Sequence, residues 1–392
     1  MAPFDASAVV LGAGASTGRR IRPGELAYEA GPGYSTKVSV WSKLFGEKAA
    51  ESSQEAALGF VPPSPGKPST LAVIPGKLTV AFHAHHALEG SAGNFLSAVT
   101  HGLHKQRQRE LVITLHLAPN DDVAERARDL SRFFTTVRHW ARHGQRVDAG
   151  ELTQFGERGL FGQSHNGLLY IAARPISGVE LPERALAGVL VDRAEARLAM
   201  DCGVHRVLTR MAESQRHFPN PTWSEINRPS VATPRESESM LVKVRRARTR
   251  SASFLVEGER LRILLSREVR ADLRGSVASL PPRTPFALLV APAANANALL
   301  VWHPGQKEPK AIKPDGSDGS RLSGSCLLIA PGGQKEQARL WEDGYSLSFA
   351  DETWARVSAA LFAAKPLKLR MADDTLLELE WQSEDVAHSR QL

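Results

Sequence analysis

Apolar and polar residues alternate in several short stretches of the chain, and this two-residue period is typical of β-strands. One such stretch is Thr36-Lys-Val-Ser-Val-Trp41. Denser apolar runs that are rich in β-branched residues predict strands at 78–82, 110–117 and 167–171. Further apolar runs, separated by turn residues, predict strands at 253–257, 262–265, 286–290, 299–302 and 327–329.

A helical period of three to four residues dominates the region after the strand at 110–117. Leu130, Phe133, Phe134, Val137 and Trp140 recur at this spacing and predict one apolar helix face. The helix is expected over 121–143, because Asn120-Asp-Asp122 can cap its start and Gly144 can stop it. Two further helices are predicted at 193–214 and 352–363.

Two polar, proline-containing segments divide the chain. Residues 48–68 and 233–240 combine Pro with Ser and Glu, a composition typical of linkers. We therefore expect an N-terminal β segment with its linker at 1–68, an α+β domain at 69–232 and a mainly-β domain at 241–382, followed by a polar tail. The predicted fold class is α+β.

Composition limits the function classes. The chain has 392 residues, a net charge of +7 and only two cysteines, which are too few for a disulfide framework or a Cys-based zinc site. No apolar run is long enough for a membrane span, and the N-terminus lacks the basic start of a signal peptide. We expect a cytoplasmic protein that binds neither membrane nor nucleic acid.

The glycine-rich stretch Val9-Val-Leu-Gly-Ala-Gly-Ala-Ser-Thr-Gly18 is the strongest motif for a nucleotide enzyme. Its glycines at 12, 14 and 18 could cradle a pyrophosphate, as in NAD-binding proteins. The spacing differs from G-x-G-x-x-G by one residue, and Pro23 and Gly24 disfavour the helix that should follow. We expect a turn between strands and keep a NAD- or nucleotide-using enzyme as the alternative.

Other chemistry-bearing residues form no complete catalytic or metal site in the sequence. His83 and His85 would share one face of a strand, but a third ligand is missing. Cys202 and Cys326 lack the local motifs of cysteine enzymes, and Glu342-Asp-Gly344 predicts a turn first. We therefore expect no catalytic residue, no metal and no cofactor.

One dense basic run lies at 243–250, with Lys243 followed by Arg245, Arg246, Arg248 and Arg250. Such a run could contact phosphates, but no aromatic residues are interleaved with the charges, as they are in single-strand binders. Charge on the edge strand of a sheet discourages aggregation. We expect the run to form a solvated edge strand.

The middle of the chain, 76–232, resembles the suppressor-of-fused (SUFU) domain family. Four ordered stretches carry the resemblance: the strand at 78–82 with Phe95-Leu-Ser-Ala-Val-Thr-His-Gly-Leu103, the strand at 109–117, the helix at 130–143 with its Gly-containing turn, and Gly167-Leu-Leu-Tyr-Ile171. Two further stretches, at 190–195 and 222–231, are similar to the family's helix entry and its ending. No flanking segment contributes to the resemblance.

The resemblance implies a SUFU-like mixed sheet with packed helices and a second, mainly-β domain. It also implies a binding protein rather than an enzyme, with a partner strand held between the domains. Bacterial relatives suggest an immunity protein or regulator that sequesters a toxin or effector; a scaffold component is a further alternative. We place the partner surface at His217, Phe218, Trp223 and Arg228, which mix aromatic and cationic groups, although packing within a loop would explain them equally well.

Overall fold

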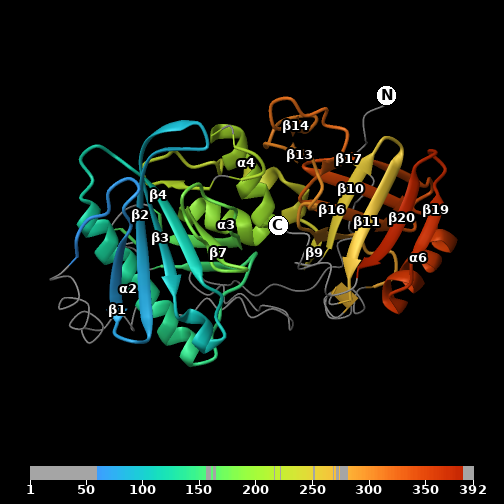
Figure 1. Ribbon diagram of the computed structural model, residues 1–392. Helices are drawn as coiled ribbons and strands as arrows, with labels where there is room; N and C mark the ends of the chain where they lie inside the picture. The colour runs from blue at the N-terminus through green and yellow to red at the C-terminus, as the bar shows by residue number, and fades with distance from the viewer. Residues whose placement is uncertain are drawn as a thin grey trace, which may run out of the picture. The chain divides into compact units, whose positions relative to one another are not determined.

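The computed structural model describes residues 60–155, 160–161, 165–215, 217–220, 222–249, 252–267, 269–270, 273 and 281–382. All of them belong to one compact unit, Lys37–Leu392. The predicted strand at 36–41, the glycine turn at 12–18 and the tail at 383–392 lie outside the described residues, as does most of the first linker. The described strands form an eight-stranded, a seven-stranded and a five-stranded sheet (Figure 1).

The first sheet has the order β1-β2-β3-β4-β7-β6-β5, and β8 pairs with β4. Its strands are β1 Ser69–Ile74, β2 Leu78–Leu88, β3 Ser91–His101, β4 Leu111–Leu117, β5 Leu152–Gln154, β6 Gly167–Ala172, β7 Leu186–Val191 and β8 Ser224–Glu225. Strands β1 to β4 are antiparallel neighbours, whereas β4 runs parallel to β7 and β8. The sheet is therefore mixed, and the three strands predicted in this region are confirmed.

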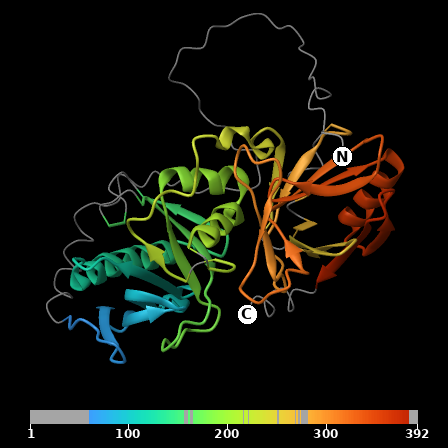
Figure 2. The ribbon, with the colours of Figure 1, turned by 90° about the horizontal axis from the view of Figure 1, so that it is seen from above.

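Helix α2, Val123–Arg142, covers one face of this sheet. Asp122 caps it, because its side chain accepts a hydrogen bond of 2.8 Å from the N–H of Ala124. The predicted apolar face is buried, with Phe134 fully covered, and packs on residues such as Leu96 and Leu115. Figure 2 shows α2 alongside the blue strands of the sheet. The predicted helix and its apolar face are confirmed.

The single helix predicted over 193–214 is wrong, because the structure has two helices there. Helix α3 spans Arg193–Cys202 and α4 spans Val204–Gln215. Gly203 separates them with φ 99° and ψ 150°, a conformation that only glycine adopts without strain. Leu198 of α3 and Leu208 of α4 belong to one apolar cluster that also contains Leu169 of β6 and Val189 of β7. The chain turns at Gly203, but the helical spacing of apolar residues continues across it, which is why the sequence predicted one helix.

Replacing Gly203 with alanine is expected to lower the free energy of unfolding by about 1–3 kcal/mol, because a Cβ makes this backbone conformation strained. The added methyl would meet Leu289 at an ordinary 3.7 Å, so strain and not a clash is the cause. Urea unfolding measures the change. A variant as stable as the wild type would show that the α3–α4 corner does not depend on glycine.

The C-terminal region contains the second and third sheets and helix α6, Asp351–Ala363. The second sheet has the order β14-β13-β15-β10-β11-β20-β19 and the third has β17-β18-β16-β12-β9. Their strands are β9 Arg245–Arg248, β10 Ala252–Glu257, β11 Arg260–Ser266, β12 Phe286–Leu289, β13 Ala298–Val301, β14 Lys310–Ile312, β15 Leu322–Ser323, β16 Cys326–Pro331, β17 Gln337–Trp341, β18 Gly344–Phe349, β19 Leu367–Arg370 and β20 Leu376–Gln382. This half is mainly β, as predicted, and the α+β class is confirmed.

Two local sequence predictions in this half are also confirmed. Glu342 and Asp343 form the turn of the β17–β18 hairpin, in which Trp341 pairs with Gly344. Strand β9 is the terminal strand of the third sheet and pairs only with β12 among the described strands. Arg245, Arg246 and Arg248 of the basic run therefore lie on an edge strand. Among the described helices, none is long and apolar enough to cross a membrane.

Candidate functional site

Trp223 lies in an apolar cluster on the sheet face opposite α2. Its side chain is 6% exposed and packs with residues of β3 and β4 such as Val99 and Val112. Its ring meets Phe95 at a centroid distance of 5.0 Å and His217 at 4.2 Å, both edge to face. Trp223 therefore fills the space over the sheet, as a core residue does.

Arg228 holds the chain segment after Trp223 against the start of α3. Its guanidinium forms an ion pair with Glu195, with an Nη2–Oε2 distance of 2.6 Å, and donates to the carbonyl of Leu190 at 3.0 Å. Glu195 is fully buried and also accepts a hydrogen bond from the N–H of Val231. Since both side chains are buried and paired, this contact positions the segment.

His217 and Phe218 are half-buried and lie nearer the surface than Trp223 and Arg228. The Nδ1 atom of His217 is 3.5 Å from the carboxylate of Glu89, which also contacts Arg174. Burial lowers the pKa of His217, and Glu89 opposes this shift. The structure thus brings His217 and Trp223 together and places Arg228 elsewhere, against Glu195 in the first turn of α3. A partner-binding role for the four residues stays a prediction.

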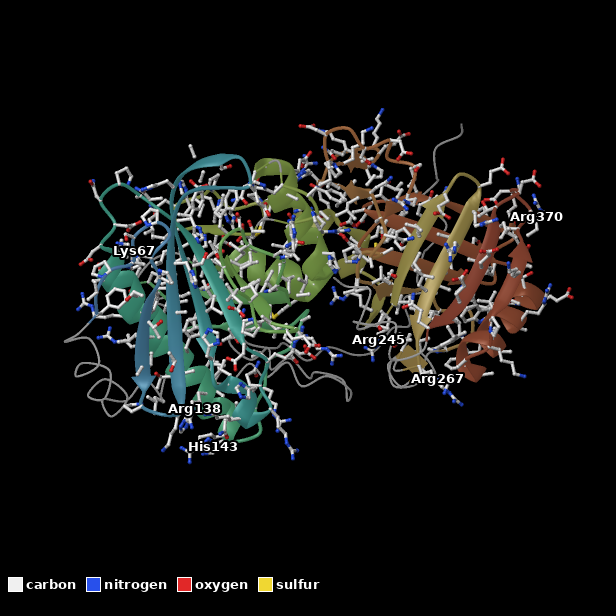
Figure 3. All side chains as sticks on the ribbon, viewed as in Figure 1. Lys67, Arg138, His143, Arg245, Arg267 and Arg370 are labelled. Carbon is white, nitrogen blue, oxygen red and sulfur yellow. The ribbon has the colours of Figure 1, made fainter. Side chains whose placement is uncertain are left out.

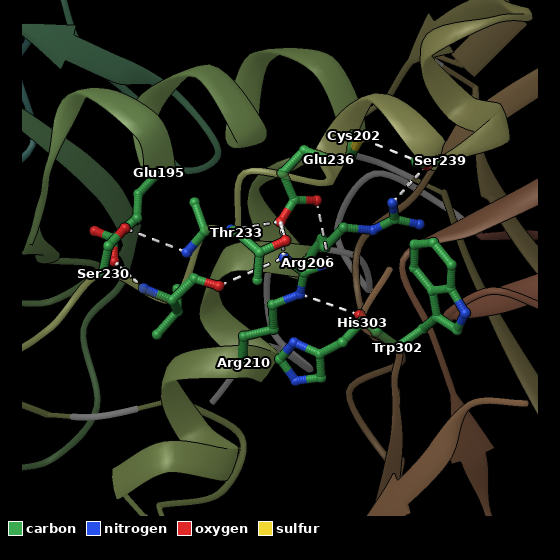
Figure 4. Close-up of polar contacts among 12 residues, drawn as sticks. Glu195, Cys202, Arg206, Arg210, Ser230, Thr233, Glu236, Ser239, Trp302 and His303 are labelled. Atoms are coloured by element: carbon green, nitrogen blue, oxygen red, sulfur yellow. Dashed lines mark hydrogen bonds and ion pairs between the residues drawn. The ribbon is translucent and has the colours of Figure 1, made fainter. Parts of the chain in front are cut away.

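A buried ionic network joins α4 to the β17–β18 turn. Figure 4 shows Arg206 of this network reaching Ser239, with Trp302 nearby. Arg206 is fully buried, and its Nε donates to Asp343 at 2.9 Å while Nη2 donates to Glu342 at 2.7 Å. Its Nη1 donates to the Ser239 hydroxyl at 2.8 Å, and its Cζ lies 5.3 Å from the centroid of the Trp302 ring. One guanidinium therefore ties the first half of the chain to the second.

Arg210, one turn further along α4, makes a second set of contacts with the other half. Its Nε donates to the carbonyl of Trp302 at 3.1 Å, and its Nη atoms pair with Glu236 in the predicted linker. Next to it, His303 lies 2.7 Å from the Glu213 carboxylate. The segment 233–240 is thus held by both halves, through the 3₁₀ helices η5 Glu236–Glu238 and η6 Met240–Val242. The domain boundaries drawn around it stay predictions.

The surroundings of this network keep Arg206 charged and keep the thiols of Cys202 and Cys326 neutral. Burial alone would lower the pKa of Arg206, but the charge and hydrogen bonds of Asp343 raise it well above its ordinary value. Burial raises the pKa of both Cys202 and Cys326, so both remain protonated at neutral pH. Burial also lowers the pKa of His205 to about 4. These groups are suited to structure rather than to nucleophilic attack.

Sequence reasoning missed Arg206 and Arg210 as connecting residues. The sequence did contain an indication of this role. Two arginines four positions apart lie on one side of the predicted helix 193–214, among its apolar residues. Burial of both sides of such a helix requires carboxylate partners for the arginines. The partners at 342–343 were visible only as a turn, so their second role needed the three-dimensional structure.

The histidines singled out in the sequence lie on one face of β2. His83 and His85 are half-buried, and the Nε2 of His85 is 3.2 Å from the Ser97 hydroxyl. Burial lowers the pKa of both imidazoles, and the neighbouring histidines His101 and His83 add to the shift. Within the described residues, no group of three or more His, Cys, Asp and Glu side chains could hold a metal ion.

Two edge strands border the apolar cluster that the halves share. Leu152 of β5 and Val244, just before β9, both pack against this cluster, which also contains Leu208 and Leu289. Strand β5 ends the first sheet and β9 ends the third, and neither has a second partner strand among the described residues. Each edge leaves main-chain groups without a strand partner among the described residues, and an extended chain can add to an edge of this kind.

Solved structures that are similar to this chain include suppressor-of-fused proteins. Drosophila Suppressor of Fused is 10% identical, with a TM-score of 0.32, over 77% of this chain and 87% of that chain. A Sufu–Fu complex structure is 12% identical, with a TM-score of 0.30, over 39% of this chain and 77% of that chain. The chain is thus similar to suppressor-of-fused structures, in agreement with the predicted resemblance.

The other comparisons are narrower. No family model matches the chain. Mouse zinc finger FYVE domain-containing protein 16 is 27% identical over 128 residues, which are 32% of this chain and 8% of that protein. The chain therefore spans a small part of that relative. Identities and TM-scores this low leave the partner of this chain to proposal, and neither a bacterial type nor a toxin follows from them.

Proposed function

We propose that the chain is a non-enzymatic protein-binding protein that takes an extended segment of its partner at the β5 and β9 edges. The observation that carries the proposal is the pair of edge strands bordering one shared apolar cluster. Strand addition gives affinity through main-chain hydrogen bonds, and side-chain pockets give selectivity. The half-buried His217 and Phe218 are proposed as a further contact for the partner.

The hydrogen bonds of β9 define which groups a partner strand would use. The N–H of Thr249 donates to the carbonyl of Leu289 on β12 at 3.1 Å. Since the direction of the N–H groups alternates along a strand, Ala247 also faces β12, whereas Arg246 and Arg248 direct theirs to the open edge. The exposed side chains of Lys243 and Arg245 lie at the same edge.

The chemistry of the described residues supports binding more than catalysis. The thiols of Cys202 and Cys326 are buried and protonated, and Asp343 is occupied by Arg206. The finer form of the proposal is a cytoplasmic immunity protein or regulator that sequesters a toxin or effector. The alternative of a NAD-using enzyme rests on the glycines at 12–18, which lie outside the described residues.

Replacing Arg248 with proline is expected to remove the N–H that the open edge of β9 offers, without breaking the ladder with β12. The matched control is Arg248→Ala, which removes the same side chain and keeps the N–H. We expect Arg248→Pro to lose partner binding by at least about tenfold, the equivalent of one main-chain hydrogen bond, and Arg248→Ala to keep it.

The measurement uses the full chain as bait in its native host, followed by titration calorimetry with the purified partner. Circular dichroism must show that both variants fold. Equal affinity of Arg248→Pro and Arg248→Ala for the partner would overturn strand addition at β9. The purified chain can also be incubated with NAD and assayed for release of nicotinamide. Release that Gly14→Val abolishes would favour the enzyme alternative instead.

A further inference from the structure

A second feature of the first half is a concentration of positive charge where α2 ends. From residue 130 to residue 147 the chain has four arginines, two histidines and no carboxylate. From 101 to 109 it has three more cations, again without a carboxylate. Figure 3 shows Arg138 and His143 together at this end of the molecule.

Hydrogen bonds bring the separate basic segments to the same place. Lys105, in the 3₁₀ helix η4 Leu103–Gln106, donates to the carbonyl of Gly76 in the β1–β2 turn at 3.3 Å. Gln108 exchanges two hydrogen bonds with the backbone of Val147, just after α2. Helix α2 itself contacts η4. We call this surface the basic end; its cations are Lys77, Lys105, Arg107, Arg138, Arg142 and Arg146.

The carboxylates nearest to the basic end are already occupied. Glu110 is buried and accepts hydrogen bonds from Thr100, from the N–H of Gly102 and from His104. Asp148 pairs with Arg109 at 2.9 Å. The positive charge of the basic end is therefore not neutralised by these groups.

Arg138 distinguishes this surface from an ordinary solvated helix face. It is 8% exposed, and its Nε has no hydrogen-bond partner among the described residues. Burial lowers its pKa, and the charge of Arg142 lowers it further, so its surroundings disfavour the cation. Arg142 and His139 also stabilise the C-terminal dipole of α2. That role does not account for a buried arginine that has no anion partner in the part of the chain that the structure describes.

We infer that the basic end binds an acidic segment of a protein, with Arg138 and Arg142 receiving its carboxylates. Guanidinium groups bind carboxylates through paired, charge-assisted hydrogen bonds. The aromatic residues of α2 are buried, so no stacking platform for nucleic-acid bases is offered. None of the large exposed hydrophobic residues of the described chain, Val61, Met240 and Leu340, belongs to the basic end, so a membrane anchor is also lacking. None of the cations of the basic end lies on β5 or β9.

The test measures the anisotropy of a fluorescein-labelled decaglutamate peptide added to the full chain at about 50 mM and about 300 mM salt. We expect binding that weakens with salt. The double variant Arg138→Gln/Arg142→Gln should weaken it about tenfold or more, as expected for lost charge-assisted hydrogen bonds. The matched control Arg267→Gln/Arg370→Gln removes two exposed arginines elsewhere and should change it less than about twofold.

A second variant separates binding from folding. Arg138→Leu removes a largely buried side chain whose Nε has no hydrogen-bond partner among the described residues, so its Tm should not fall, while decaglutamate binding weakens. Equal losses in both double variants, unchanged binding in Arg138→Leu, or no binding by the wild type would each overturn the inference. So would tighter, Arg138-dependent binding to duplex DNA or to phosphatidylserine vesicles, since the occupant would then carry phosphates.

Discussion

Replacing Arg206 with methionine is expected to lower the free energy of unfolding by about 3–5 kcal/mol, the cost of removing one member of a buried ion pair. The cost arises because Asp343 and Glu342 would stay buried without the guanidinium that pairs with them. Methionine keeps most of the volume of arginine, so the effect reports charge rather than a cavity. Urea unfolding followed by tryptophan fluorescence measures it.

The control for Arg206 is Arg197→Met, on the neighbouring helix α3. Arg197 is mostly exposed and pairs with Asp201 one turn away, a type of contact worth about 0.3–0.5 kcal/mol. The triple variant Arg206→Met/Glu342→Gln/Asp343→Asn should recover part of the loss, because it leaves no unpaired buried charge. If Arg206→Met costs no more than Arg197→Met, the network does not hold the two halves together.

Local sequence patterns were sufficient wherever the structure is determined by neighbours in the chain. Helix α2 was predictable because its buried residues recur every three to four positions and Asp122 caps it from the adjacent position. The position of β9 at a sheet edge followed from the density of its arginines, since charge disfavours a central strand. In these cases the residues that are buried and the local conformation of the backbone both follow from the same short stretch of sequence.

The connecting network was not predictable, because its members come from distant parts of the chain. Arg206 and Asp343 are 137 positions apart, and no local pattern specifies which carboxylate meets which arginine. Gly203 shows a related difficulty. The apolar period continues across it, so periodicity alone predicted one helix, and only the backbone angles of the glycine reveal the corner.

The sequence left two interpretations of Trp223 open for a physical reason. Aromatic residues near cations are typical both of binding hot spots and of packed loops, and composition does not separate the two. The deciding contact is with Phe95 of β3, which is far from Trp223 in the sequence. Burial against β3 favours packing, and this interpretation has a measurable consequence.

Replacing Trp223 with alanine is expected to lower the free energy of unfolding by about 3–5 kcal/mol, as for other large aromatic residues removed from a core. The removed ring leaves a cavity between Phe95 and His217, whose edge-to-face contacts are lost. Thermal unfolding of the full chain without any partner measures the change. Phe218→Ala is the control from the same segment, since Phe218 is only half-buried and should cost less.

The two variants also separate folding from recognition. Phe218→Ala should weaken partner binding while the chain stays folded, if this segment contributes to the proposed interface. Trp223→Ala should affect binding only through the fraction of chain that unfolds. A Trp223→Ala variant with an unchanged melting curve and a binding loss of about 2 kcal/mol or more would reverse this assignment and make Trp223 the hot spot. Its position against Phe95 predicts the opposite order, with stability lost first and binding lost only as a consequence.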